Sequence, residues 1–502
     1  MAARSVAAGI LVSRLLGFVR ERLFAHYFGN SVTAGAFRAA LRIPNVIRNL
    51  LGEGTLSASF IPTYSGLLAR GDVAGARALA GAILGLLVTL TALAAGVGVA
   101  VAPLITDIVA PGLRGDGRDL TVTLVRILFP MSGVLILSAW CLGILNAHGR
   151  FFLGYAAPAL WNVAQIAVLV AAGASIAGAP LAIALAFGAL AGGVLQFAAQ
   201  LPTALRAVGG VRPTLDTRNG DVRRVIGAWI PVVVGAGVVQ VSAIVDTQLA
   251  SLLGAAAIAQ LGYAQLFAVL PVSLFGVSVA AAALPALSRD VAGAGDQAAR
   301  GRIATGLNRI VYWVVPCAVA FALLGPALVA GLFQTGAFDA DDTALVSGVL
   351  AAYAIGVLAQ AAIKLLASGF YALGDTRTPV RVAIGSVVLA AGLGAWWMQY
   401  FLAAGIALGA AAGAWVNVSL LVTLLRRRTG RITTVDAWRQ WTLALVAALA
   451  AGAAAVWVGS QTGALPPWAG GALVAAAFAL LYLGVTRILR HPEAPRGRRR
   501  TA

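Results

Sequence analysis

Long apolar segments, separated by short polar connections, follow one another from end to end of the chain. Most are close to 20 residues, the length that an α-helix needs to cross about 30 Å of hydrocarbon. Their Ala, Leu, Val and Gly residues run on without the alternation that membrane β-strands require. We therefore predict an all-α, polytopic membrane protein with about fourteen transmembrane helices.

The first two predicted helices cover residues 5–27 and 34–68. The second should be broken near Pro44, because proline removes a backbone donor, and Asn45 can bond the groups that this frees. The first lacks a small-residue cleavage site, so we interpret it as a retained span and not as a signal peptide. Other predicted helices include residues 79–102, 120–146, 225–253, 344–373 and 471–489.

Composition agrees with this picture, since 60% of the 502 residues are hydrophobic and only 11% are charged. The net charge of +19 comes from arginines gathered in alternate loops, as the positive-inside rule predicts. Both termini should therefore be cytoplasmic, with an even number of helices. Nucleic acid is a poor candidate partner, because these charges are dispersed and lack an aromatic-interleaved platform.

Cysteine and histidine chemistry offers little in this chain. Cys141 and Cys317 lie in apolar helices, where we expect packing residues and neither a disulfide framework nor a metal site. The three histidines have no spacing that resembles metal ligation. The longest polar connections are too short to build a soluble domain.

Charges inside the first predicted helices are the strongest functional signal. Arg14, Arg20, Arg48 and Glu53 interrupt segments that are otherwise apolar enough to span a bilayer. Intramembrane charge is expensive and usually marks a substrate or ion pathway.

The sequence also repeats itself. The segment that begins at Phe60 resembles the one that begins at Ala283, and a weaker pair begins at Leu145 and Tyr371. We predict two related six-helix halves, residues 1–205 and 221–425, then two extra helices in 437–489 and a basic cytoplasmic tail, 490–502. Tandem halves with Pro- or Gly-interrupted helices are typical of secondary transporters.

Five long motifs resemble the MurJ/MviN lipid II flippases of bacterial peptidoglycan synthesis, which belong to the multidrug, oligosaccharidyl-lipid and polysaccharide exporter superfamily. They are SRLLGFVRERLFAHYFG, RIPNVIRNLLGEGTLSASFIPTYS, ILNAHGRFF, LFQTGAFDADDT and FYALGDTRTP. The resemblance implies two six-helix lobes around a cationic cavity, and two further helices that form a groove for a lipid tail. It implies alternating access in the bacterial cytoplasmic membrane, with lipid II or a similar undecaprenyl-diphosphate glycan as the substrate and no catalytic residues.

Guanidinium groups suit such a substrate, because they are always charged and bind phosphate oxygens in pairs. Arg14 and Arg20 could flank one diphosphate; the alternative for Arg20 is that its side chain reaches to the membrane interface. The resemblance places the family's essential arginine at Arg48. Glu53 is then either a structural partner of Arg48 or a gate, and Asn45 joins the predicted substrate contacts.

Two acids in the second half suggest ion coupling, and a lysine there joins the predicted substrate contacts. Asp246, the only acid in its predicted helix, should be protonated, paired or bound to a cation. Similarity to the family suggests a sodium or proton site shared with Asp375, which could equally be a helix cap or an Asx turn. Lys364, the sole lysine, is either a cavity charge or a pairing partner.

The chain departs from the family pattern at two places. Gln265 and Leu266 stand where members often have an acid and an arginine, and Gly35 stands where an aspartate is common. A different lipid-linked glycan, or a multidrug substrate within the same superfamily, is the nearer alternative. A membrane enzyme acting on polyprenyl diphosphates is the more distant one, because the outer loops offer few acid–base groups.

Overall fold

The computed structural model describes residues 2–293, 295–430 and 435–494, in which every regular element is a helix. An isolated antiparallel bridge joins Thr335 and Phe338. Ten of the described helices are long and apolar enough to cross a membrane. The all-α, multi-pass prediction is confirmed. Helices α1, α2 and α10, which carry the charges discussed below, are not among those ten.

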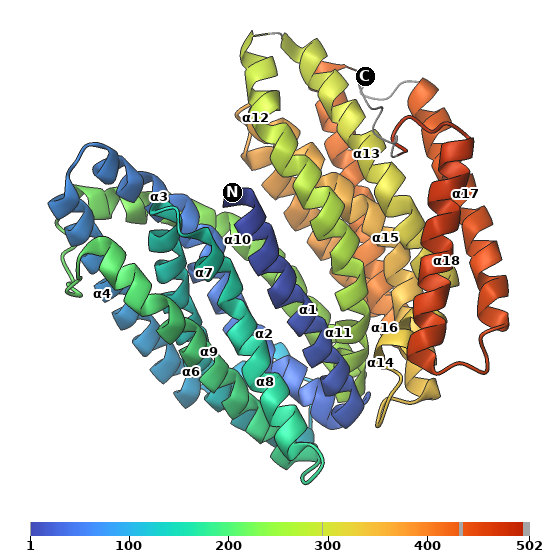
Figure 1. The fold of residues 1–502 in the computed structure, drawn as a ribbon, viewed down its shortest axis with the longest axis horizontal. Helices are drawn as coiled ribbons and strands as arrows, with labels where there is room; N and C mark the ends of the chain where they lie inside the picture. The colour runs from blue at the N-terminus through green and yellow to red at the C-terminus, as the bar shows by residue number, and fades with distance from the viewer. Residues whose placement is uncertain (1, 294, 431–434, 495–502) are drawn as a thin grey trace, which may run out of the picture. The chain divides into compact units, whose positions relative to one another are not determined.

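The chain forms two compact units, Met1–Ile258 and Ala259–Ala502 (Figure 1). The first unit contains α1 (Ala2–Phe28), α2 (Val32–Leu51), α3 (Glu53–Ala69), α4 (Val73–Ala100), α5 (Ala102–Val109), α6 (Gly115–Ala147), α7 (Phe151–Ala156), α8 (Pro158–Ala172), α9 (Gly178–Val208) and α10 (Gly220–Leu252). After α11 (Ala255–Pro271), the second contains η1 (Val272–Val277), α12 (Ser278–Gly293), α13 (Gly295–Leu323), α14 (Gly325–Phe333), α15 (Ala340–Ala372), α16 (Arg377–Thr429), α17 (Val435–Ser460) and α18 (Pro467–Ile488).

Packing groups α10 with the first unit. It contacts α2, α3, α4 and α5, and the side chain of Gln248 donates to the carbonyl of Ile108 at 2.7 Å. The six-helix halves expected from the repeats are a division by sequence similarity and stay a prediction.

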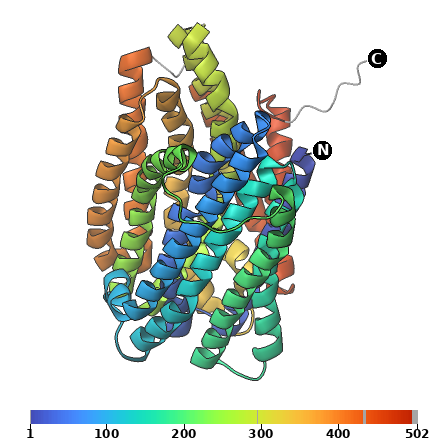
Figure 2. The same cartoon turned by 90° about the vertical axis from the view of Figure 1, so that its left-hand side faces the viewer.

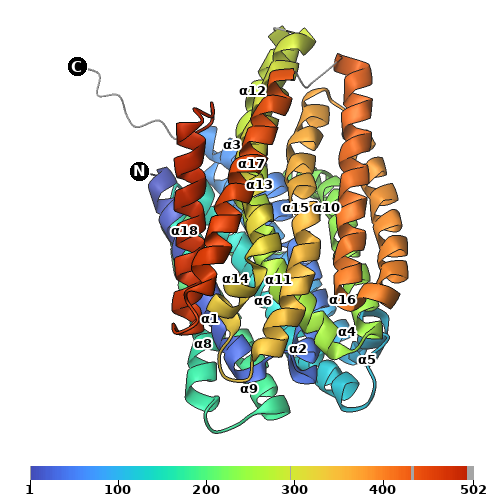
Figure 3. The same cartoon turned by 90° about the vertical axis from the view of Figure 1, so that its right-hand side faces the viewer.

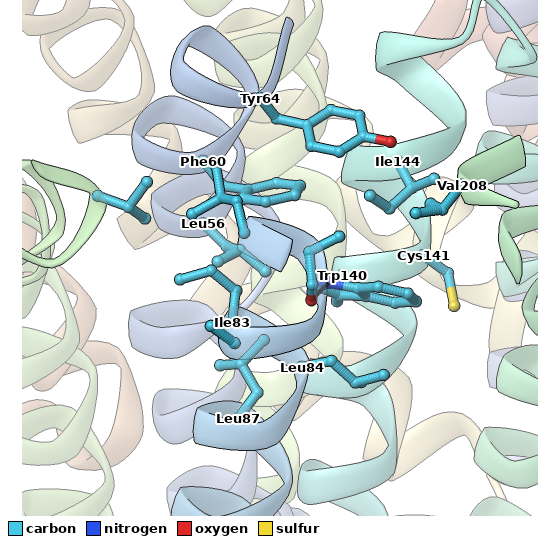
Figure 4. Packing of buried hydrophobic residues seen from close by; sticks show 14 of the residues in the cluster. Leu56, Phe60, Tyr64, Ile83, Leu84, Leu87, Trp140, Cys141, Ile144 and Val208 are labelled. Carbon is cyan, nitrogen blue, oxygen red and sulfur yellow. Dashed lines mark hydrogen bonds between the residues drawn. The ribbon is translucent and has the colours of Figure 1, made fainter. Parts of the chain in front are cut away.

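An apolar core holds α3, α4 and α6 together in the first unit, where these helices run side by side (Figures 2 and 4). Phe60 and Tyr64 stack with ring centroids 5.1 Å apart, and Trp140 donates its indole N–H to the carbonyl of Ala80 at 3.2 Å. Cys141 is a buried free thiol in the same cluster. The scaffold behind the charged helices is thus a packed hydrophobic interior.

The break in the second predicted span was placed wrongly. Helix α2 continues through Pro44 and ends at Leu51, and α3 begins after Gly52. A Cβ on Gly52 would lie 2.4 Å from the carbonyl oxygen of Arg48, so only glycine fits this close turn. Pro44 costs one helical hydrogen bond, which a buried helix tolerates, whereas the turn at Gly52 redirects the chain.

Several helices begin earlier than the apolar pattern predicts. Helix α10 begins at residue 220 instead of 225, and α15 at residue 340 instead of 344. Asn219 and Asp339 cap these helices, each accepting a backbone N–H at 2.8 Å. Their first turns are polar, so hydropathy alone places the starts too late.

The two weaker repeats adopt the same turn. Gly149 ends α6 with a φ of 70° and Gly374 follows α15 with a φ of 75°. In each turn, the N–H of the next residue donates to the carbonyl five positions back, at 2.8 Å after Gly149 and 2.9 Å after Gly374. This is a Schellman ending, which glycine allows because it has no Cβ to clash.

Helix α16 in the second unit consists of two helical halves that meet at Leu402, where φ is 51° and ψ is −133° (Figure 3). A Cβ on Gly405, Gly409 or Gly413 would lie within 2.7 Å of atoms of the other half. The halves therefore pack with their backbones in contact. A separate apolar core joins α13, α17 and α18.

We expect Gly374→Ala to lower the free energy of unfolding by about 1–2 kcal/mol, because alanine is strained at positive φ. The measurement is the thermal midpoint of the purified protein in detergent. Gly385→Ala is the matched control, since a Cβ there meets open space within α16. Equal midpoints for the two variants would contradict the turn geometry.

Candidate substrate cavity

A cavity of about 470 Å³ lies inside the first unit, a volume in the range of small-molecule binding sites. Helices α1, α2, α6, α8 and α9 contribute to its wall, together with Gly54 and Tyr155. Its polar and aromatic lining residues are Ser13, Arg14, Arg48, Asn49, Tyr155, Trp161, Asn162 and Gln196. Two cations therefore share one cavity with amide and aromatic groups.

Arg14 and Arg48, predicted to be functional, are the two basic residues of this wall. Arg14 is exposed to the cavity and makes no ion pair with any described residue. Arg48 lies in the last turn of α2, directly before the break at Gly52. Two guanidinium groups in one wall suit an anionic group.

Arg20 is not part of the wall but belongs to a network behind it. Glu21 accepts from Arg20 at 2.5 Å and from Arg38 of α2 at 2.9 Å, and all three side chains are less than a fifth exposed. The single carboxylate thus bridges α1 and α2. Whether Arg20 also reaches the membrane interface stays a prediction.

Aromatic rings cover the two guanidinium groups of this network. Arg20 lies over Trp161 at 4.6 Å from the ring centroid, and Arg38 over Phe24 at 5.1 Å. Trp161 also lines the cavity, so one ring separates the Arg20–Glu21 pair from the cavity. Cation–π contacts of this kind are stronger when water is excluded.

A buried chain of polar groups leads away from the cavity. Gln196 donates to the hydroxyl of Ser138 at 2.9 Å, Ser138 bonds Gln200 at 3.0 Å, and Gln200 donates to the carbonyl of Gly154 at 3.4 Å. These side chains are at most 4% exposed. Because unpaired buried amides are costly, the chain fixes α6, α7 and α9 relative to one another.

Asp246 lies on α10 within the first unit, partly buried. Arg42 of α2 interacts electrostatically with it and donates to the neighbouring Thr247 hydroxyl at 2.8 Å. Which of the three expected states this carboxylate adopts stays a prediction.

Asp375 occupies the turn before α16. Its carboxylate accepts the backbone N–H groups of Arg377 at 3.1 Å and Thr378 at 2.9 Å, and it pairs with Arg428 at 2.7 Å. Hydrogen bonds from Thr378 are the largest cause that lowers the pKa of Asp375 to about 2. This is the helix-cap alternative, in which the carboxylate oxygens are already engaged.

The remaining predicted residues are dispersed. Asn45 lies in α2 outside the cavity wall, where its neighbour Asn49 one turn later takes part. Lys364 is exposed on α15, with no ion pair to any described residue. The side chain of Glu53 lies outside the described residues. Gln265 and Leu266 are half-buried in α11.

The described His, Cys, Asp and Glu side chains include no group of three that could hold a metal ion.

A family model described as lipid II flippase MurJ matches residues 24–478. The chain belongs to the lipid II flippase MurJ family. It is 35% identical to the lipid II flippase MurJ of Burkholderia cenocepacia over 451 residues, 88% of this chain and 87% of that protein. It is 34% identical to a probable lipid II flippase MurJ of Rhizobium tropici, over 84% of this chain and 80% of the other.

Solved structures confirm the fold of this family member. A lipid II flippase MurJ in an inward closed conformation superposes with a TM-score of 0.80 at 21% identity, covering 97% of this chain and 99% of the other. An inward-facing multidrug resistance MATE family transporter gives 0.67 at 16% identity, covering 86% and 99%. The shared fold therefore extends to exporters outside the family.

Reasoning from the sequence missed Glu21, Trp161, Asn162 and Gln196. Glu21 directly follows Arg20, so an acid between two arginines in an apolar helix was a usable signal. Trp161, Asn162 and Gln196 had none, because an isolated aromatic or amide in an apolar helix is common.

We expect Glu21→Gln to destabilise the protein by about 2–3 kcal/mol, because two partly buried arginines lose their carboxylate. The thermal midpoint in detergent measures the effect. Asp119→Asn is the control: its carboxylate is 77% exposed, 3.7 Å from Arg118, and should change stability by less than about 0.5 kcal/mol. A Glu21→Gln protein as stable as the parent would show that the bridge contributes nothing.

Proposed function

We propose that this protein is a transporter that moves lipid II from the inner to the outer face of the bacterial cytoplasmic membrane by alternating access. The observation that carries the proposal is the cavity that Arg14 and Arg48 line together with Asn49, Asn162 and Gln196. Its family membership supports the same substrate.

Arg14 and Arg48 would hold the diphosphate. A diphosphate that enters the cavity loses hydrogen bonds to water. Guanidinium groups replace these with charge-assisted hydrogen bonds to the phosphate oxygens. Asn49, Asn162 and Gln196 then offer amide groups to the sugar hydroxyls. Phosphate and sugar contacts would thus come from one wall.

Glu21 would be the partner of the neighbouring cations when no substrate is bound. It pairs with both Arg20 and Arg38 while the cavity is empty, and an entering phosphate could replace the carboxylate as the partner of Arg20. Such an exchange would couple substrate entry to the contact between α1 and α2.

The energy source we propose is a membrane potential or an ion gradient. Moving one elementary charge across 100 mV is worth about 2.3 kcal/mol. Asp246 would carry the coupling ion, a proton or Na⁺. Arg42 is the described residue that interacts electrostatically with this carboxylate, and the ion would bind when Arg42 moves away. Asp375 is a weaker candidate, since its oxygens already cap α16.

Multidrug export is the second candidate, because MATE transporters share the fold. A cavity with two arginines disfavours cationic drugs. A membrane enzyme remains a third candidate, distinguished by incubation with labelled lipid II, whose mass an enzyme changes and a flippase does not.

The decisive test is complementation of a bacterium whose own lipid II flippase can be switched off, with outward exposure of lipid II measured directly. The parent protein should restore exposure, and an Arg14→Ala, Arg48→Ala double variant present at the same level should not. Arg70→Ala, in an exposed loop, is the control and should rescue fully. Full rescue by the double variant would refute the anionic site.

The coupling residue can be tested with the same assay in vesicles. Asp246→Asn should abolish the dependence of transport on the ion gradient, because it removes the charge that binds the ion. Asp375→Asn should keep that dependence, because asparagine also caps a helix. The reverse pattern would assign coupling to Asp375.

A further inference from the structure

A second cavity, of about 490 Å³, lies within the second unit and is almost entirely apolar. Helices α13, α15, α16 and α17 form its wall, whereas α18 contributes no residue to it. It therefore differs from the groove for a lipid tail that the family resemblance places at α17 and α18. Trp415, Ser419 and Arg426 are among its lining residues on α16, on one face of the helix.

The depth of this groove matches one leaflet of a bilayer. Its wall on α16 extends from Trp415 to Arg426, which at 1.5 Å per residue is about 16 Å, close to half of a hydrocarbon core of about 30 Å. Its wall lies toward the end of α16 and the start of α17, with Arg426 close to the last residue of α16 and Trp438 close to the first of α17. A diacyl lipid chain has this reach, whereas an undecaprenyl chain is far longer.

The open end of the groove has the chemistry of a lipid headgroup site. Arg426 lies there, followed by the exposed Arg427 and Arg428. Trp438 and Trp441 stand opposite with ring centroids 5.0 Å apart, and Trp441 donates its indole N–H to Asn308 at 2.8 Å. Tryptophan and arginine together are typical of the membrane interface, and the positive charge selects an anionic headgroup.

We propose that this groove binds one anionic phospholipid of the surrounding leaflet, with an acyl chain along α16 and the phosphate at Arg426. The site is independent of the transport cavity, and lipid binding is measured without transport.

The experiment is native mass spectrometry of the full-length protein in detergent, titrated with phosphatidylglycerol or with phosphatidylcholine of the same chains. The parent should prefer phosphatidylglycerol about fivefold, the effect of one interfacial arginine. Arg426→Gln should abolish that preference, and Arg427→Gln, the same change one residue away, should keep it. Ser419→Trp, which fills the groove from an exposed position, should weaken binding of both lipids.

Three results would overturn the proposal. Equal losses in Arg426→Gln and Arg427→Gln would indicate diffuse attraction to the basic cluster. Unchanged phosphatidylglycerol binding in Ser419→Trp would place the lipid elsewhere. Displacement of phosphatidylglycerol by undecaprenyl phosphate, itself lost in Ser419→Trp, would assign the groove to a polyprenyl tail.

Discussion

The bridge from Glu21 to Arg20 and Arg38 is the interaction on which the charged part of the structure depends. A guanidinium at the centre of a membrane helix costs about 2.5–3.5 kcal/mol on insertion scales. The arginines of α1 and α2 would raise the insertion free energy of these helices if they were unpaired. One carboxylate shared by two arginines offsets part of this cost, and the rings of Trp161 and Phe24 cover the two guanidinium groups.

Once this pairing is in place, the arginines of the first unit divide into two kinds. Arg20 and Arg38 share Glu21 between α1 and α2, whereas Arg14 and Arg48 line the cavity. The chain turns at Gly52, one helical turn after Arg48, and Gly54 lines the same wall. The paired arginines and the cavity-lining arginines therefore lie on the same two helices.

Hydropathy predicts most of the long helices, because membrane insertion depends on the same quantity, but α1, α2 and α10 are not among the ten that it selects. It could not place their first turns, where Asn219 and Asp339 cap the chain with polar atoms. Pro44 was the natural breakpoint by local rules, yet the break lies at Gly52, where crowding against Arg48 decides. The Glu21–Arg38 pair joins residues 17 positions apart on different helices, which a helical repeat does not reveal.

Helix α16 has a mechanical consequence. Its two halves touch along Gly405, Gly409 and Gly413, where backbone atoms and the Cβ of Ala390 lie in direct contact and no long side chain separates the halves. If the two halves slid or splayed apart, a gap would open between them, and the dispersion energy of the atoms now in contact would be lost. The two halves of α16 should therefore move as one rigid body, so that a displacement at the Arg428–Asp375 end also displaces Leu402.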